Sequence, residues 1–467
     1  MLPRLIQRAS IWVGVPFFLV ACTFTYYGQL HRKQSGDTYG TVYTTVALVE
    51  RQTIWLDGYL PYIKERTGER AYMLTEGPSG HTVTATPTAS SLLALPVVAA
   101  FSAAGVEAGD FDTWMEAGML TAAMAAAASV ALLFLVLTQL TTRGRAAIIA
   151  ATYAWGTLTW GVTGQALWQH AGAALALSTV LLALVQRRFT LAGAAAGAMV
   201  AFRLPMGIIA LFLLPIVGRR WRDWARFALG LLPYAVALAA YNFVAFGSPL
   251  EQGYGTDHVR DVLDIDVSNL AQGLPGLLIS PGRGLFVYSP ILLFALFGAI
   301  RGWRIPVYRW CAVAAAAFIV IAANSSQWHG GESFGPRRLV DILPLLALLL
   351  VPALDAIWRT RWVWAYAALL AWSVSVQLLG TASWEVAAWY DERDITVNEA
   401  WWDPLDNEIV AIVQSPGLVP RLLAMLGILL GGILLGALAT ATTRSSSRAI
   451  GDRRERLIES RADEVRS

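Results

Sequence analysis

The chain has 467 residues, of which 56% are hydrophobic and only 14% are charged, and its formal net charge is +3 at pH 7. This composition excludes an ordinary soluble protein and is typical of a helical protein with many membrane spans. The two cysteines, Cys22 and Cys311, both lie in apolar segments, so no disulfide framework is expected. Residues 19–22 resemble a bacterial lipoprotein cleavage box, but we expect no lipid on Cys22, because such short matches are frequent in apolar helices.

Apolar segments follow one another along most of the chain, and a membrane span needs about 20 such residues. They lie near residues 10–30, 87–104, 116–139, 146–164, 170–186, 189–202, 204–218, 227–246, 284–300, 306–323, 338–357, 362–380 and 419–441. The sequence therefore predicts an all-α polytopic membrane protein with about 12 transmembrane helices. We expect a single membrane domain over 1–441 and a flexible, charged cytoplasmic tail over 442–467.

The basic turns orient the predicted spans, because arginine and lysine are enriched in cytoplasmic loops. All later basic turns fall on the cytoplasmic side if segment 87–104 lies along the outer interface and does not span. Both termini are then cytoplasmic, in an inner cell membrane. The extracytoplasmic loops are predicted at 31–115, 247–283, 324–337 and 381–418.

The first outer loop places a carboxylate, Asp37, just after the first predicted span. Apolar residues recur at helical spacing over 38–51, which predicts an interfacial helix directly after Asp37. Asp37 is then either the cap of this helix or a reactive carboxylate held at the membrane surface, and both interpretations remain open. Tyr39 and Asp57 lie in the same loop and are candidates for substrate contact.

The apolar stretch 189–218 is interrupted at Arg203 and Pro205, while basic residues flank both of its ends. We expect two short helices that meet part-way across the membrane, with Arg203 at the break. An ionisable residue in such a place is a functional hypothesis by default. The alternative is an arginine paired with a structural carboxylate.

The richest polar cluster is the loop 327–338, which combines tryptophan, histidine, glutamate, two arginines and three glycines. Adjacent arginines can bind a phosphate through paired hydrogen bonds, so Arg337 and Arg338 are candidate phosphate ligands. Arg283 and Tyr288 stand where another predicted span begins on the outer side, and Tyr254 lies in a turn-rich loop that can line an acceptor path. For each of these three, a purely structural role is the alternative.

These features together resemble the GT-C superfamily of integral-membrane glycosyltransferases, which includes the protein O-mannosyltransferases and the lipid A aminoarabinose transferase. The matching residues are the Gly36-Asp37 step before an interfacial helix, the Thr86-Pro87 opening of a second such helix, the break at Arg203, the segment from Tyr241-Asn242 to Gly247-Ser248-Pro249, and the Trp328-x-Gly330-Gly331-x-Ser333-x-Gly335-Pro336-Arg337 loop. One departure is that Thr38 follows Asp37, where many relatives have a second acidic residue.

The resemblance implies an inverting transfer of a sugar from a polyprenyl-phosphate donor to a glycan, lipid or protein acceptor, with Asp37 as general base. The implied donor-phosphate ligands are Arg337, Arg338, Arg203 and Arg283. The implied substrate-binding residues are Tyr39, Asp57, Tyr254, Tyr288, Trp328, His329 and Glu332. We expect no cofactor, because Asp37 lacks an adjacent acidic partner for a metal.

Two other functions remain open at this point. A polysaccharide polymerase or ligase is also a multi-span protein with arginine and histidine in outer loops, but its main loop comes late in the chain. A lipid-linked-sugar transporter or flippase needs ionisable residues deep inside several spans, and here Arg203 is the main example. Nucleic-acid binding is not expected, because the outer loops are acidic.

Overall fold

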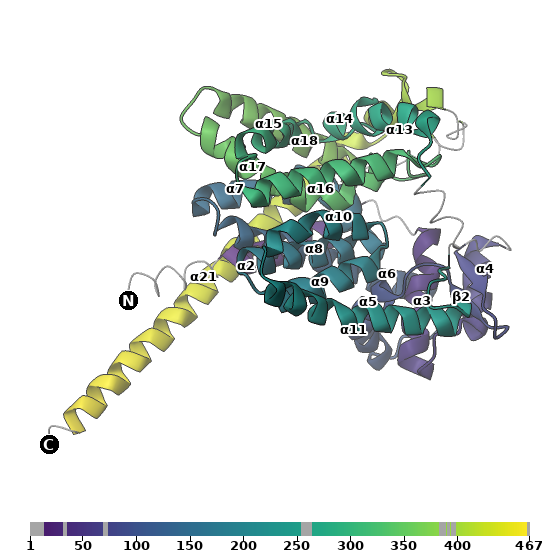
Figure 1. The fold of residues 1–467 in the computed structure, drawn as a ribbon, viewed down its shortest axis with the longest axis horizontal. Coiled ribbons are helices and arrows are strands. Elements are labelled where there is room, and N and C mark those ends of the chain that lie inside the picture. Colours follow the sequence, from purple (N-terminus) through teal and green to yellow (C-terminus); the bar gives the residue numbers. More distant parts are fainter. Residues whose placement is uncertain are drawn as a thin grey trace.

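The computed structural model describes residues 14–30, 35–68, 73–253, 264–382, 389, 393 and 398–464, and only the backbone over 444–464. Most of these residues are helical (Figure 1). The first half contains α2 (Gly14–Tyr27), α3 (Gly36–Arg51), η1 (Asp57–Tyr59), α4 (Leu60–Thr67), β1 (Leu74–Glu76), β2 (Thr82–Thr84), α5 (Ala89–Ala103), α6 (Phe111–Leu137), α7 (Arg143–Trp155), the π-helical turn η2 (Thr159–Thr163), α8 (Gln169–Val185), α9 (Phe189–Phe202), α10 (Met206–Leu213), η3 (Leu214–Val217) and α11 (Trp221–Phe246). The second half contains α13 (Val267–Ile279), α14 (Leu285–Tyr288), η4 (Pro290–Leu292), α15 (Leu293–Gly302), α16 (Pro306–Ala323), η5 (Arg337–Ile342), α17 (Leu343–Ile357), α18 (Trp362–Ala382), η6 (Asn398–Trp401), α20 (Glu408–Gln414) and α21 (Leu418–Glu464).

Six helical segments in the described part of the chain are long and apolar enough to cross a membrane. They are Phe111–Leu137, Trp221–Phe246, Pro306–Ala323, Arg337–Ile357, Trp362–Ala382 and Leu418–Thr443. The remaining apolar helices have 10–17 residues, which at about 1.5 Å per residue is less than the thickness of a bilayer core. The predicted all-helical membrane class is confirmed in this form, whereas the predicted number of about 12 spans is not.

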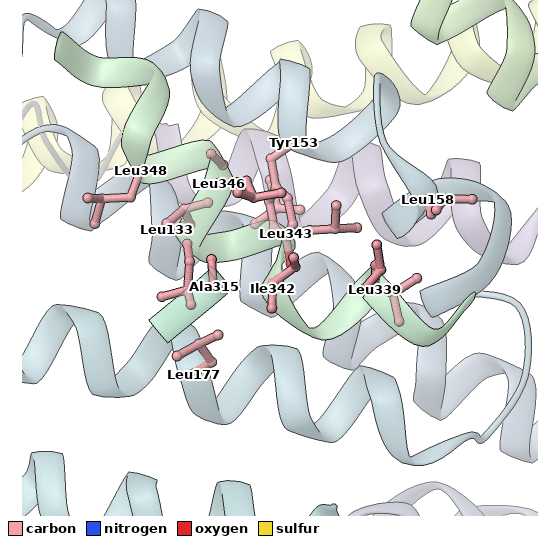
Figure 2. Packing of buried hydrophobic residues seen from close by; sticks show 14 of the residues in the cluster. Leu133, Tyr153, Leu158, Leu177, Ala315, Leu339, Ile342, Leu343, Leu346 and Leu348 are labelled. Atoms are coloured by element: carbon pink, nitrogen blue, oxygen red, sulfur yellow. The ribbon is translucent and has the colours of Figure 1, made fainter. Parts of the chain in front are cut away.

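Two helices form the centre of the bundle and others form its periphery. In α6 and in the segment formed by η5 and α17, 78% and 83% of the apolar window is buried, compared with 17% in α11 and in α21. Figure 2 shows leucines of α17 packing between side chains of α6, α7, α8 and α16. Apolar side chains on α11 and α21 instead face outward, as expected of helices that contact lipid.

The segment after α2 forms a small unit with its own hydrophobic core. In this unit α3, η1, α4, α5 and the start of α6 bury an aromatic cluster that includes Tyr43, Tyr59 and Trp114. Strands β1 and β2 form an antiparallel hairpin in which Leu74 pairs with Thr84 and Glu76 with Thr82. The unit lies at one side of the molecule (Figure 1). Helices α3 and α5 lie where the sequence predicted the two interfacial helices.

The break predicted inside 189–218 is present. Helix α9 ends at Phe202, Arg203 is extended (φ −153°, ψ 112°), and α10 begins at Met206. Pro205 contributes to the break because it lacks an N–H group and restricts the residue before it. Arg203 therefore stands at the interruption between the two helices.

The C-terminal segment is helical as far as the structure describes it. Helix α21 continues without interruption to Glu464, through the residues predicted to form a flexible tail, and extends away from the bundle in Figure 1. The tail is rich in arginine, which favours helix. At the other end of the chain, Cys22 is fully buried within α2.

Candidate functional site

Asp37 follows Gly36 in the first turn of α3. Its carboxylate contacts a side chain from a distant segment of the chain. Its Oδ2 accepts a hydrogen bond from Nη2 of Arg337 at 2.6 Å, across 300 residues of sequence. The two side chains are 16% and 21% exposed, so water competes little for this ion pair. The structure thus brings together the predicted base and the first predicted phosphate ligand.

Trp168 holds this pair in place from the other side. The guanidinium carbon of Arg337 lies 4.4 Å from the centre of the Trp168 ring, which is a cation–π contact. The indole Nε1 of Trp168 donates to the hydroxyl of Ser35, the residue that precedes α3. Trp168 directly precedes α8, so the start of α8 fixes both partners of the Asp37–Arg337 pair.

Hydroxyl groups tie α3 to the rest of its unit and so fix the direction of Asp37. The hydroxyl of Thr41 lies 2.8 Å from that of Thr86, which lies 2.7 Å from that of Thr84. From α5, the Ser91 hydroxyl donates to the carbonyl of Thr41. Because these groups are buried, each hydrogen bond is costly to break, and α3 is held rigidly.

A second charged cluster lies one turn beyond Arg337, around Asp341. The Asp341 carboxylate is fully buried and forms an ion pair with Arg203 from the break between α9 and α10. Its other oxygen lies 3.0 Å from Nδ1 of His170, on the first turn of α8. The arginine predicted at the apex of a broken helix therefore has a structural carboxylate as its partner, and its role as a phosphate ligand has no support in this contact.

Arg338 differs from these arginines. Within the described residues its side chain forms no hydrogen bond and no ion pair, although it is only partly exposed and lies beside the like charge of Arg337. Desolvating a cation without an anionic partner is unfavourable, so this arrangement calls for an anion that comes from outside the chain.

His329 adds a hydrogen-bond donor near Arg338. Its Nδ1 accepts a hydrogen bond from the backbone N–H of Gly331, which assigns the proton to Nε2, and Nε2 is buried without a partner in the described structure. Burial, and then the positive charges of Arg283 and Arg338, lower the pKa of His329 to about 4. The neutral ring therefore has an N–H group that can donate a hydrogen bond to an anion.

The loop that carries His329 is shaped by a buried ion pair between Arg283 and Glu408. Arg283 is fully buried, and its guanidinium donates to the carbonyls of His329 (2.9 Å) and Gly331 (2.8 Å) as well as to Glu408. Its guanidinium carbon lies 4.2 Å from the centre of the Trp401 ring. These contacts favour a positioning role for Arg283 over the predicted phosphate contact.

Glu408 connects the same loop to α14. Its Oε2 accepts hydrogen bonds from the hydroxyl of Tyr288 (2.8 Å) and from the backbone N–H of Gly335 (3.0 Å). Gly330, Gly331 and Gly335 all have positive φ, between 61° and 80°, which glycine adopts without strain. The glycines and the Arg283–Glu408 pair thus set the path by which the loop reaches Arg337.

The other residues predicted to contact substrate are dispersed. Tyr39 packs edge-on against Phe111 in the core of the small unit, and Trp328 is buried against Trp401. Asp57 contacts His81 and the backbone N–H of Thr82. Glu332 is exposed, and Tyr254 lies outside the described residues.

Three residues that sequence reasoning missed hold the site together. Asp341 is a lone carboxylate near the start of a long apolar run, a signal that marks an intramembrane ionisable residue. His170 is the second partner of Asp341, and a single histidine at the start of an apolar segment gives no such signal. Glu408 carries no such signal, because it lies in a loop with several other acidic residues.

Within the part of the chain that the structure describes, no three His, Cys, Asp or Glu side chains are grouped so as to hold a metal ion. In comparisons with known proteins, no family model, no curated protein and no solved structure matches the chain.

Proposed function

We propose that the chain is an integral-membrane glycosyltransferase that transfers a sugar from a polyprenyl-phosphate donor to an acceptor hydroxyl on a glycan, lipid or protein. The observation that carries this proposal is the contact between Asp37 and Arg337, beside which lies Arg338, without a partner in the described part of the chain. The transfer needs a carboxylate for the acceptor and cations for the donor phosphate. Segments 300 residues apart supply both at one place.

The chemistry assigns each group a separate task. Asp37 takes the proton of the acceptor hydroxyl as that oxygen attacks the anomeric carbon. The bond from the anomeric carbon to the phosphate oxygen breaks, its electron pair stays on the phosphate, and the configuration inverts. Arg338, Arg337 and the Nε2–H of His329 stabilise the charge that the leaving phosphate gains.

The ion pair of Asp37 with Arg337 fits this scheme because a guanidinium has five N–H donors. Before the donor binds, Nη2 of Arg337 donates to Asp37, and its other N–H groups are available to a phosphate. A phosphate that draws Arg337 toward itself also loosens the hydrogen bond to Asp37, and the carboxylate then becomes available to the acceptor. Donor binding and base activation are coupled in this way.

In this proposal the shorter apolar helices complete the membrane domain, to about 12 membrane segments in an inner cell membrane. Both termini are cytoplasmic, and the site around Asp37 opens on the extracytoplasmic side. The basic turns support this orientation, because arginines gather in the loops at the opposite ends of the spans. The small unit with α3 and α5 then lies at the outer membrane surface.

One observation favours a second function, that of a lipid-linked-sugar transporter. Arg203, Asp341 and His170 form a buried ionisable cluster, which is the kind of feature that transporters place inside their membrane domain. A transporter moves its substrate without breaking a glycosidic phosphate bond. Product analysis therefore separates the two functions.

The test is mass spectrometry of lipids that copurify with the full chain, followed by incubation with an acceptor glycan. We expect a polyprenyl monophosphate or its sugar ester, and conversion of the ester to free polyprenyl phosphate as the glycan gains one sugar. Copurification of a sugar ester that is never cleaved, but crosses the bilayer of a proteoliposome, would establish the transporter. A polyprenyl diphosphate that carries an oligosaccharide would instead indicate a polymerase or ligase.

A further inference from the structure

A basic cavity lies at the far end of α8 and α9 from the candidate site. Its volume is about 460 Å³, within the usual range of ligand pockets. Helix α8 has 17 residues and therefore separates the two places by about 25 Å. We call this cavity the basic pocket. Its lining comes from the turn between α8 and α9 with the start of α9, and from the end of η3 through the first turns of α11. The residues are Arg187, Phe189, Val217, Gly218, Arg219, Arg220, Asp223 and Arg226.

The charges of the basic pocket are unbalanced. Among its four arginines, only Arg226 has a carboxylate partner, Asp223 at 3.3 Å. The side chains of Arg187, Arg219 and Arg220 form no hydrogen bond and no ion pair within the described residues. One acidic residue against four arginines leaves a local charge of about +3, which favours an anion.

Close packing of α9 on α11 creates the pocket. A Cβ atom on Gly193 would collide with the carbonyl of Phe227, and one on Gly230 with the carbonyl of Thr190. Two glycines that face each other's backbone in this way allow the helices to approach closely. The arginines that precede α11 thereby lie beside Arg187 in the lining of the pocket. Figure 1 shows α8, α9 and α11 in the lower part of the bundle.

The surroundings of the pocket point to lipid. The outer face of α11 exposes large apolar side chains, among them Leu229 (65%) and Val236 (58%), and this surface begins directly beside the pocket. At the same level Trp221 is 73% exposed and Trp224 39% exposed, and exposed tryptophans gather where headgroups meet water. A ligand in the pocket therefore has water on one side and acyl chains on the other.

We propose that the basic pocket binds the phosphate-bearing headgroup of an anionic phospholipid. Arginines bind a phosphate diester through paired hydrogen bonds, and the acyl chains of the lipid lie along the apolar face of α11. The adjoining lipid surface is the reason to assign a lipid and not free phosphate. Binding here is independent of the proposed sugar transfer, because the two sites share no residue.

The test uses the purified full chain in a neutral detergent, titrated with phosphatidylglycerol or with phosphatidylcholine of the same acyl chains, and native mass spectrometry to count bound lipid. We expect wild type to bind phosphatidylglycerol at least about 10-fold more tightly than phosphatidylcholine. Each arginine near a headgroup contributes about a 5-fold effect, so the double variant R219A/R220A should bind phosphatidylglycerol about 30-fold more weakly.

The matched control is R222A, because Arg222 belongs to the same segment but packs on Trp221 and does not line the pocket. Its affinity should remain within about 2-fold of wild type. The charge-retaining variant R219K/R220K loses the paired hydrogen bonds but not the charge, so its affinity should lie between those of wild type and R219A/R220A. It replaces the double alanine variant if that protein does not fold. Equal affinity for the two lipids, or equal losses in R222A and R219A/R220A, would overturn the proposal. Displacement of phosphatidylglycerol by millimolar inorganic phosphate would overturn the assignment to a lipid.

Discussion

The two ends of the α8–α9 pair place arginines in opposite circumstances. At the end near Asp37, Arg203 and Arg337 each contact a carboxylate from a distant part of the chain. At the other end, Arg187 and Arg219 have no partner within the described structure and line an open cavity. Burial explains the difference: a desolvated charge is stable only with a partner, whereas a charge in contact with water needs none. Arg338 belongs to the buried end but has no partner among the described residues, which sets it apart from Arg203 and Arg337.

The largest effect is expected from Asp37→Asn. The asparagine amide cannot take up the proton of the acceptor hydroxyl, so the rate of sugar transfer should fall by about 100- to 10,000-fold. The thermal midpoint of unfolding should change little, because the amide oxygen still accepts a hydrogen bond from Arg337. The measurement is sugar transfer in proteoliposomes. Asp112→Asn is the control, since Asp112 is an exposed carboxylate that pairs with Arg66 in the same small unit. Equal activity of the two variants would eliminate Asp37 as the base.

A loss of stability is expected from Glu408→Ala. The variant leaves the buried charge of Arg283 unpaired and removes the acceptor of Tyr288 and Gly335, so the free energy of unfolding should fall by about 3–5 kcal/mol. Thermal unfolding in detergent, monitored by circular dichroism, measures this loss of stability. Asp406→Asn is the matched control two residues away: its carboxylate is 46% exposed and pairs with Arg393, so about 1 kcal/mol or less should be lost. If both variants lose the same stability, burial does not distinguish the two pairs.

Arg338→Ala should separate binding from folding. We expect the apparent affinity for the polyprenyl-phosphate sugar to fall by about 10- to 150-fold, the range for losing a hydrogen bond to a charged group. Stability should stay the same or rise, because the variant removes the repulsion between Arg338 and Arg337. Arg337→Ala, by contrast, should lower both donor affinity and stability, since Arg337 also holds Asp37. A titration with the donor measures the affinity of each variant, and a melting curve measures its stability. If Arg338→Ala lost stability but kept its affinity for the donor, the role of Arg338 in phosphate binding would be contradicted.

The smallest effect is expected from pH. Because the pKa of His329 is about 4 in the folded protein and near 6.5 in the unfolded chain, the unfolded chain binds more protons between these values. Stability is therefore complete above pH 6.5 and decreases as the pH falls toward 4, by about 1–2 kcal/mol at pH 5. Melting curves at pH 7 and pH 5 should show a larger loss in wild type than in His329→Gln. An equal loss in both would mean that His329 is not the group that titrates.

Some of the site was predictable because it depends on local sequence. Gly36-Asp37 before a helical pattern predicted where α3 begins, and Arg203 beside Pro205 predicted the break between α9 and α10. The cluster from Trp328 to Arg338 was recognisable because a simple connector needs no such set of polar residues. Each of these signals spans only a few residues.

The partners of these groups were not predictable, because they depend on neighbours that are distant in sequence. Arg283 and Arg337 look alike in sequence, since both stand at the outer end of an apolar segment. Only the fold places a fully buried Glu408 against Arg283, which gives that arginine a role in positioning, and Asp37 against Arg337. The number of membrane spans stays a prediction, because the structure divides an apolar run such as 146–164 into α7 and a π-helical turn.

The sequence by itself determined the helical membrane class and the segments that carry polar chemistry, because hydrophobic composition and short-range turn and helix signals act locally. The tertiary structure decided which arginines are paired with carboxylates and which remain open to a ligand. That outcome follows from desolvation, which each charge experiences only once helices from other parts of the chain have packed around it.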